Sequence, residues 1–393
     1  MHNNQVYAGL WIGSVNSYDP GTDEAATDEP ADSRIARTVT FNGPRTVEVE
    51  HGFVPEPGPD EVLVEAAVSA ISAGTEGLLY RNEAPTDLPA DESIDALAGD
   101  LSYPLAYGYA VVGNVRAVGA NVSPAWLDRR VFAYNPHESH FLAVPADLVR
   151  VPDTVATETA ALFANMESAV TFLHDGEPLL GERAIVLGQG VVGLLTTGLL
   201  AHTPLESLIT VERHELRRTL SERLGADRSI PPPGDLPAAL ASVGDGRADR
   251  DGRADRDGRA DLTYELTGSP DALDEAIAMT AYDGRVIVGS WYGRNAVSLD
   301  LGGRFHRERI DVRASQVSTI APRHRGRFDR DRRHEIAWHW LEHLDLEPLI
   351  THRVRVERAG EAYRLLEEQP TEAVQVLLTY DRADRDAREG HRL

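Results

Sequence analysis

The chain has 393 residues, a length that predicts two or three domains rather than one small core. Hydrophobic residues make up 42% of it, which is enough to bury sizeable cores and excludes wholesale disorder. There are 63 acidic and 39 basic residues, and the formal charge of -24 argues against a nucleic-acid binder that works by neutralising phosphates.

Lysine and cysteine are both absent, since every basic residue is arginine and the cysteine count is 0. The lack of lysine excludes a Schiff-base lysine, a Walker A lysine and a lysine general base. The lack of cysteine excludes disulfides, a thiolate nucleophile and zinc held by cysteine. Abundant Arg, Asp, Glu, Ala and Gly without lysine predicts a halophilic cytoplasm, where molar salt screens the acidic surface.

The chain begins with a segment that we predict to be a disordered lead-in over residues 1–35, because residues 19–34 are acidic and nearly without apolar side chains. No apolar run approaches the ~20 residues needed to cross a bilayer, and the N-terminus lacks the positive region of a secretory signal. We therefore expect a cytoplasmic protein that contacts no membrane.

From residue 36 to about residue 152, short runs of β-branched residues are separated by Gly and Pro, which predicts a β-rich, barrel-like domain. After residue 153 the apolar spacing becomes helical over 154–175, and strands then alternate with helices. This alternation predicts an α/β architecture with an open, doubly wound parallel sheet. GRADRD repeats predict a low-complexity insertion over 244–261, and the polar residues 382–393 predict a frayed tail.

The strongest motif is Gly188-Gln189-Gly190-Val191-Val192-Gly193, which directly follows the apolar strand AIVL and opens an apolar helix. Gly188 allows a tight turn from strand to helix, and Gly190 has no side chain to hold the backbone away from a pyrophosphate. Gly193 lets the helix lie close to the sheet. The free N–H groups and the positive end of the helix then attract a diphosphate, so the motif predicts a dinucleotide site.

An acidic residue at the end of the next strand completes this signature. Glu212 follows SLITV and would accept hydrogen bonds from the adenosine ribose, which favours NAD over NADP. Arg213 leaves NADP open, because an arginine at this place can pair with a 2′-phosphate. Four further candidates for cofactor binding follow later strands of the sheet: Thr267, Gly268, Gly289 and Ser290.

The order of a β-rich domain, a dinucleotide fold and a return to mixed structure resembles the medium-chain dehydrogenase/reductase superfamily, which includes the zinc-type alcohol dehydrogenases, over residues 38–380. The segments ISAGTE, PHESHFLAVP, FANMESA and VLGQGVVGLL resemble its subgroup without zinc ligands, which includes bacteriochlorophyllide-type dehydrogenases. The resemblance implies a GroES-like catalytic domain over 36–165, completed by 322–381, and a Rossmann domain over 166–321. It also implies a substrate cleft between the two domains.

This resemblance also implies that the catalytic zinc is absent. Zinc-binding members carry a cysteine near Ser72, and they carry His-Glu where this chain has Tyr109-Ala110 after a glycine. Their third ligand would fall near Ala164 or Asn165. Hydroxyl and methyl groups are not the imidazole and thiolate ligands that zinc prefers.

Without a Lewis acid, hydride transfer still needs a group that polarises the substrate oxygen or exchanges a proton with it. Four residues on segments that face the cleft by resemblance are candidate catalytic groups: Glu76, Tyr109, His137 and Glu167. Tyr109 could equally be a packed aromatic residue, and His137 a solvated loop histidine. The arginine-rich run over 323–333 predicts a solvated connector, with capture of an anionic substrate as the alternative.

We therefore expect an NAD(P)-dependent oxidoreductase that moves a hydride between nicotinamide and a carbonyl or alcohol of a small molecule, without zinc. The alternatives are a quinone- or enoyl-type reductase, and a dinucleotide-binding regulator that has lost its chemistry. By analogy with the superfamily, we expect a homo-oligomer.

Overall fold

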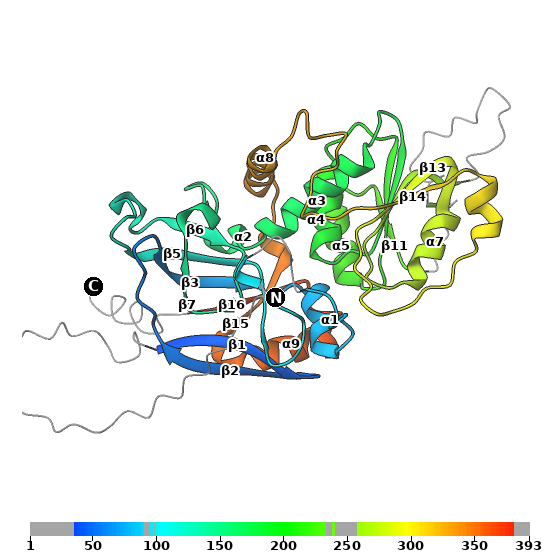
Figure 1. Ribbon diagram of the computed structural model, residues 1–393. Coiled ribbons are helices and arrows are strands. Elements are labelled where there is room, and N and C mark those ends of the chain that lie inside the picture. Colours follow the sequence, from blue (N-terminus) through cyan, green and yellow to red (C-terminus); the bar gives the residue numbers. More distant parts are fainter. Residues whose placement is uncertain (1–34, 90–94, 98, 233–237, 240–257, 381–393) are drawn as a thin grey trace, which may run out of the picture. The chain divides into compact units, whose positions relative to one another are not determined.

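A computed structural model of the chain describes residues 35–89, 95–97, 99–232, 238–239 and 258–380 (Figure 1). The predicted lead-in, except for Ile35, lies outside the described residues, as do the tail and most of the predicted insertion. Among the described helices, none is long and apolar enough to cross a membrane. The insertion ends earlier than predicted, because a strand already begins at Ala260.

The β-rich part contains two sheets. In the smaller sheet β1 (Ile35–Gly43) lies between β2 (Thr46–Phe53) and the short β4 (Leu105–Ala106). The larger sheet has the order β15-β16-β3-β5-β6-β8, and β7 also pairs with β3. Its strands are β3 (Val62–Ala70), β5 (Val111–Val118), β6 (Arg130–Ala133), β7 (His140–Ala143), β8 (Leu148–Arg150), β15 (Ile350–Arg355) and β16 (Gln375–Thr379). The sheet thus joins strands from both ends of the described chain, since β16 runs antiparallel to β3.

The third sheet is entirely parallel and has the order β11-β10-β9-β12-β13-β14. Its strands are β9 (Arg183–Leu187), β10 (Ser207–Val211), β11 (Arg228–Ile230), β12 (Ala260–Glu265), β13 (Thr280–Val288) and β14 (Asp311–Ala314). Counted along the chain this order is 3-2-1-4-5-6, the arrangement of doubly wound dinucleotide-binding sheets. The predicted fold class, a GroES-like β-rich part with a Rossmann sheet, is confirmed.

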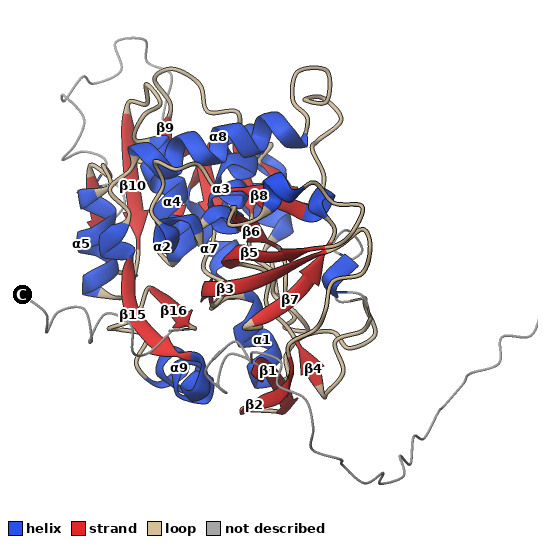
Figure 2. Cartoon of the chain, turned by 90° about the vertical axis from the view of Figure 1, so that its left-hand side faces the viewer, coloured by secondary structure: helices blue, strands red, loops and turns tan. Residues whose placement is uncertain are grey.

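Helices cover both faces of the parallel sheet (Figures 1 and 2). They are α4 (Val191–Leu200), α5 (Glu215–Arg223) and α7 (Asp271–Met279). The central strand β9 shows why its sequence is a continuous apolar run. Ile185 and Leu187 pack with the α7 side, whereas Ala184 and Val186 pack on the other side. A strand buried on both faces cannot alternate between polar and apolar residues.

The helix predicted over 154–175 is divided into α2 (Thr157–Ala160) and α3 (Phe163–Gly176), with a turn at 161–162. The predicted boundary between the two domains, at residues 165 and 166, falls within α3. The other helices of the β-rich part are α1 (Thr75–Arg81), α8 (Arg330–His343) and α9 (Ala359–Glu368).

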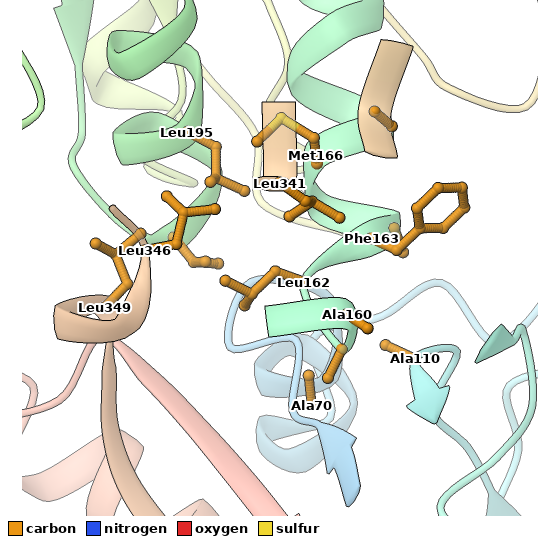
Figure 3. Close-up of a cluster of buried hydrophobic side chains, with 14 of the residues drawn as sticks. Ala70, Ala110, Ala160, Leu162, Phe163, Met166, Leu195, Leu341, Leu346 and Leu349 are labelled. Atoms are coloured by element: carbon orange, nitrogen blue, oxygen red, sulfur yellow. The ribbon is translucent and has the colours of Figure 1, made fainter. Parts of the chain in front are cut away.

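One hydrophobic cluster connects the large mixed sheet with the helices of the parallel sheet (Figure 3). It contains Ala70 of β3, Leu162 and Phe163 at the start of α3, Leu195 of α4 and Leu341 of α8. Leu162, Phe163 and Leu195 are completely buried, and burial of each such side chain contributes about 1.5–3 kcal/mol. The two sheets therefore share a continuous core through α3.

Candidate active site and dinucleotide site

The three motif glycines occupy three different environments at the end of β9. Gly188 has a φ of +85°, and a Cβ there would lie 2.7 Å from the carbonyl oxygen of Leu266. Gly193 packs so closely that a Cβ would lie 2.0 Å from the carbonyl oxygen of Gly188. A Cβ at Gly190, the N-cap of α4, would meet no atom within 4 Å. The first and third glycines are thus required by close contacts, and the second faces open space.

Val191 and Val192 form the first turn of α4, directly after this open glycine. The predicted acidic partner, Glu212, lies at the end of β10 and is 6% exposed. Its Oε2 accepts a 2.8 Å hydrogen bond from the Gln189 N–H, and its Oε1 accepts one of 2.9 Å from the His214 N–H. The carboxylate is therefore joined directly to the glycine turn, and the adjacent Arg213 is exposed.

The candidate residues after β12 and β13 also lie together. The Gly268 N–H donates to the Ser290 Oγ at 2.9 Å, and the Gly289 N–H donates to the carbonyl oxygen of Glu265 at 3.1 Å. Glu265 was not among the predicted residues, and its buried carboxylate accepts a hydrogen bond from the Thr267 N–H at 2.8 Å. The presence of a glutamate within the otherwise largely apolar run LTYEL could have indicated it.

Two of the four candidate catalytic residues meet in a completely buried polar network. The Glu76 Oε2 lies 3.0 Å from the His137 Nε2 and accepts a 2.5 Å bond from the Tyr363 hydroxyl. The Glu76 Oε1 accepts from the Ser72 N–H at 2.8 Å, and the His137 Nδ1 lies 2.7 Å from the Ser69 Oγ. Both candidate side chains are 0% exposed, so His137 is not a solvated loop residue.

Tyr109 lies at the edge of this network and is half-buried. Its hydroxyl donates to the Ser72 Oγ, and the Thr75 Oγ1 lies 3.4 Å away. Its ring packs against both large hydrophobic clusters. Ser72 joins Tyr109 to the buried network, because its N–H donates to Glu76. The hydroxyl groups of Tyr109, Ser72 and Thr75 thus lie together beside the buried network.

Glu167 is buried on α3 and is held by three side chains. The Arg333 Nη2 lies 2.7 Å from its Oε1, the His334 Nε2 lies 3.1 Å from the same oxygen, and the Tyr134 hydroxyl donates to Oε2 at 2.5 Å. Burial alone would raise the pKa of the Glu167 carboxyl, but the bond to His334, the charge of Arg333 and the bond from Tyr134 lower it below its usual value. Glu167 is therefore a structural anion at neutral pH.

Most arginines of the arginine-rich run are exposed, as expected of a solvated connector, but Arg333 is buried and the predicted local pairing of charges is wrong for two of the arginines. Asp329 caps α8 by accepting a 2.8 Å bond from the Arg332 N–H, and Arg333 is only 4% exposed. Arg323 pairs with Asp175 at 3.2 Å. The charges looked balanced locally, but two of the arginines pair with acids about 150 residues away in the chain.

A search against known protein families finds no matching family model. Curated proteins match over nearly the whole chain. L-threonine 3-dehydrogenase of Thermococcus kodakarensis is 24% identical over 84% of this chain and 94% of its own length. The enzyme of Pyrococcus furiosus is 25% identical over 88% and 98%. D-guloside 3-dehydrogenase of Escherichia coli K12 is 22% identical over 82% and 93%.

Solved structures share the fold across the same range. An alcohol dehydrogenase from Escherichia coli CFT073, solved with NADH, superposes with a TM-score of 0.69 at 17% identity over 88% of this chain and all of that one. Galactitol-1-phosphate dehydrogenase of Escherichia coli gives 0.67 at 17% identity, over 87% and 99%. A protein from Sinorhizobium meliloti 1021, solved with NADP, gives 0.67 at 19% identity, over 88% and 99%.

The similarity to curated dehydrogenases over most of the chain indicates an NAD(P)-dependent oxidoreductase. These relatives, and the solved structures that share the fold, are dehydrogenases of the medium-chain, alcohol dehydrogenase-like type.

Proposed function

We propose that the chain transfers a hydride between NAD and a carbonyl or alcohol of a small molecule, and that it does so without a catalytic zinc. The observation that carries the proposal is the open backbone at Gly190, flanked by the close-packed Gly188 and Gly193 and joined through Gln189 to Glu212. When bound, the nicotinamide coenzyme supplies the donor or acceptor of the hydride.

The chain's own residues would bind the diphosphate and the adenosine half of the coenzyme. The N–H groups of the first turn of α4 would hold the diphosphate, and Glu212 would accept bonds from the adenosine ribose. NAD is favoured over NADP, because the Glu212 carboxylate repels a 2′-phosphate, although Arg213 stands beside it.

Zinc is not part of the proposed mechanism, because the donor set does not fit it. At or near the positions where the resemblance places zinc ligands, the chain has the hydroxyl groups of Ser72 and Tyr109 and either the methyl group of Ala164 or the amide of Asn165, and it contains no cysteine. Among the described residues there is also no group of three or more His, Asp or Glu side chains that could hold a metal.

We propose Tyr109 as the group that hydrogen-bonds to the substrate oxygen and exchanges a proton with it. Of the four candidates it alone retains a partly exposed side chain, whereas Glu76, His137 and Glu167 are 0–3% exposed. The buried Glu76 and His137 would act by holding the Ser72 segment against which Tyr109 rests. Glu167 would act by holding α3 to α8.

The dinucleotide proposal is tested by comparing two alanine variants. Each variant is titrated with NADH and with NADPH, and the change in tryptophan fluorescence gives the dissociation constant. Gly190→Ala has room for its methyl group and should fold, but the methyl group would enter the space for the diphosphate and weaken binding at least tenfold. Gly326→Ala, at an exposed glycine with equally open surroundings, is the control. Equal affinities for the two variants would contradict the proposal.

The proposal also covers the substrate and the working conditions. We propose that the substrate is an alcohol, a sugar alcohol or a related carbonyl compound, as in the relatives, or a compound like the substrates of the bacteriochlorophyllide-type subgroup. We also propose that the protein is a homo-oligomer and works at high salt. A panel of alcohols and aldehydes assayed in molar KCl, with metal analysis and sedimentation of the same sample, tests these points. Stoichiometric zinc would overturn the zinc-free part.

A further inference from the structure

Glu265, the last residue of β12, is a completely buried carboxylate beside the glycine turn. It accepts three hydrogen bonds from side chains and backbone of two different loops. The Thr267 N–H and hydroxyl donate to Oε1 at 2.8 and 2.5 Å, and the Tyr292 hydroxyl donates to Oε2 at 2.5 Å. Burial and the bond to Glu265 raise the pKa of the Tyr292 phenol, which therefore remains a donor at neutral pH.

These bonds join the loop after β12 to the loop after β13. The carbonyl oxygen of Glu265 accepts from the Gly289 N–H at 3.1 Å, and the Gly268 N–H donates to the Ser290 Oγ at 2.9 Å. The joined loops lie against the first motif glycine, since a Cβ at Gly188 would be 2.7 Å from Thr267 Cα. A buried carboxylate is costly unless its bonds are kept, so Glu265 holds both loops in one arrangement.

The second loop is also held at its far end. The Arg294 N–H donates to the carbonyl oxygen of Glu83 at 2.9 Å, and the Arg294 Nη2 donates to the Thr86 Oγ1 at 2.8 Å. Gly293 has a φ of +60°, and a Cβ there would lie 2.4 Å from the same Glu83 oxygen. Glu265 therefore fixes the base of a loop whose tip contacts the segment that follows α1.

We propose that Glu265 is a positioning residue for the nicotinamide half of the coenzyme, acting through Thr267 and Tyr292. This inference rests on the proposed function. A doubly wound sheet consists of two mononucleotide-binding halves. Glu212 belongs to the half formed by β9, β10 and β11, whereas Glu265 belongs to the half formed by β12, β13 and β14. The two carboxylates should therefore control different parts of one ligand.

The test compares binding of NADH with binding of ADP, which lacks the nicotinamide nucleotide. In the variants Glu265→Gln and Tyr292→Phe, we expect the dissociation constant for NADH to rise at least tenfold while that for ADP changes less than twofold. Tyr292→Phe removes only one hydroxyl group, so it still tests the proposal if Glu265→Gln does not fold. Thr263→Val is the matched control, because it removes a buried hydroxyl bond from the same strand away from the loops.

An unchanged affinity for NADH in both variants, or an equal loss for NADH and ADP, would overturn the positioning role. A wild-type protein that binds neither NADH nor NADPH would instead overturn the proposed function, and the inference with it. Hydrogen exchange without coenzyme gives a second readout. Faster exchange at the Gly268 and Gly289 amides in Tyr292→Phe, but not in Thr263→Val, supports the proposal, and identical exchange contradicts it.

Discussion

The ion pair between Glu167 and Arg333 offers the most direct test of how α3 and α8 are held together. The two side chains are 4% and 5% exposed, and the Arg333 Nη2 lies 2.7 Å from the Glu167 Oε1. In Arg333→Met the long side chain is retained, but Glu167 loses its guanidinium partner, and the carbonyl oxygen of Val317 loses a 2.8 Å bond. Removal of one partner from a buried pair costs about 3–5 kcal/mol, and we expect unfolding free energy to fall by that amount.

Urea unfolding, monitored by tryptophan fluorescence, measures this change. The Trp338 ring of α8 stacks on the Phe163 ring of α3 with 4.2 Å between the ring centroids, so separation of the two helices should alter the fluorescence. The control is Arg223→Met, which breaks an exposed pair with Asp345 and should cost less than about 1 kcal/mol. A loss in Arg333→Met no greater than in this control would refute the reasoning. The double variant Glu167→Leu/Arg333→Met should recover most of the loss, since it leaves no unpaired charge.

Three further predictions follow from the same geometry. Gly193→Ala should lower the unfolding free energy by about 1–3 kcal/mol in urea titrations, because its Cβ would lie 2.0 Å from the Gly188 carbonyl oxygen. Tyr109→Phe should reduce kcat by about 100-fold or more in steady-state assays, with the dissociation constant for NADH unchanged. Burial lowers the pKa of His174 to about 4, below its unfolded value, so the folded state should lose stability as the pH falls from about 6.5 to 4. The expected loss of unfolding free energy is about 1–2 kcal/mol after allowance for partial exposure of the ring. Urea unfolding at several pH values should show this loss in the wild-type protein but not in His174→Asn.

The parts of the fold that the sequence predicted depend on local patterns. A strand that is buried on both faces is a continuous apolar run, and β9 is such a strand. The glycine turn that begins α4 follows β9 within three residues. The spacing from Gly193 to Glu212 predicted a carboxylate at the end of the next strand, because one helix and one strand of ordinary length separate them, and Glu212 directly follows β10. Each of these features is contained within about thirty residues.

The contacts of the candidate catalytic residues could not be predicted in this way. Glu76 meets Tyr363, which is 287 residues away, and Glu167 meets Arg333, which is 166 residues away. Such pairs form only when α9 packs against α1 and α8 packs against α3, and a single sequence contains no local sign of that packing. Residue type therefore pointed to polar groups but did not distinguish exposed groups from buried ones.

Three of the buried carboxylates share one kind of hydrogen-bond donor. Glu76, Glu167 and Glu265 each accept a 2.5 Å bond from a tyrosine hydroxyl: Tyr363, Tyr134 and Tyr292. Burial raises the pKa of each of these phenols, and the adjacent carboxylate raises it further, so all three remain neutral donors at physiological pH. A neutral donor has no net charge for salt to screen, unlike the surface arginine pairs. If the chain works at molar salt, these three bonds should therefore keep the site assembled where exposed ion pairs no longer contribute.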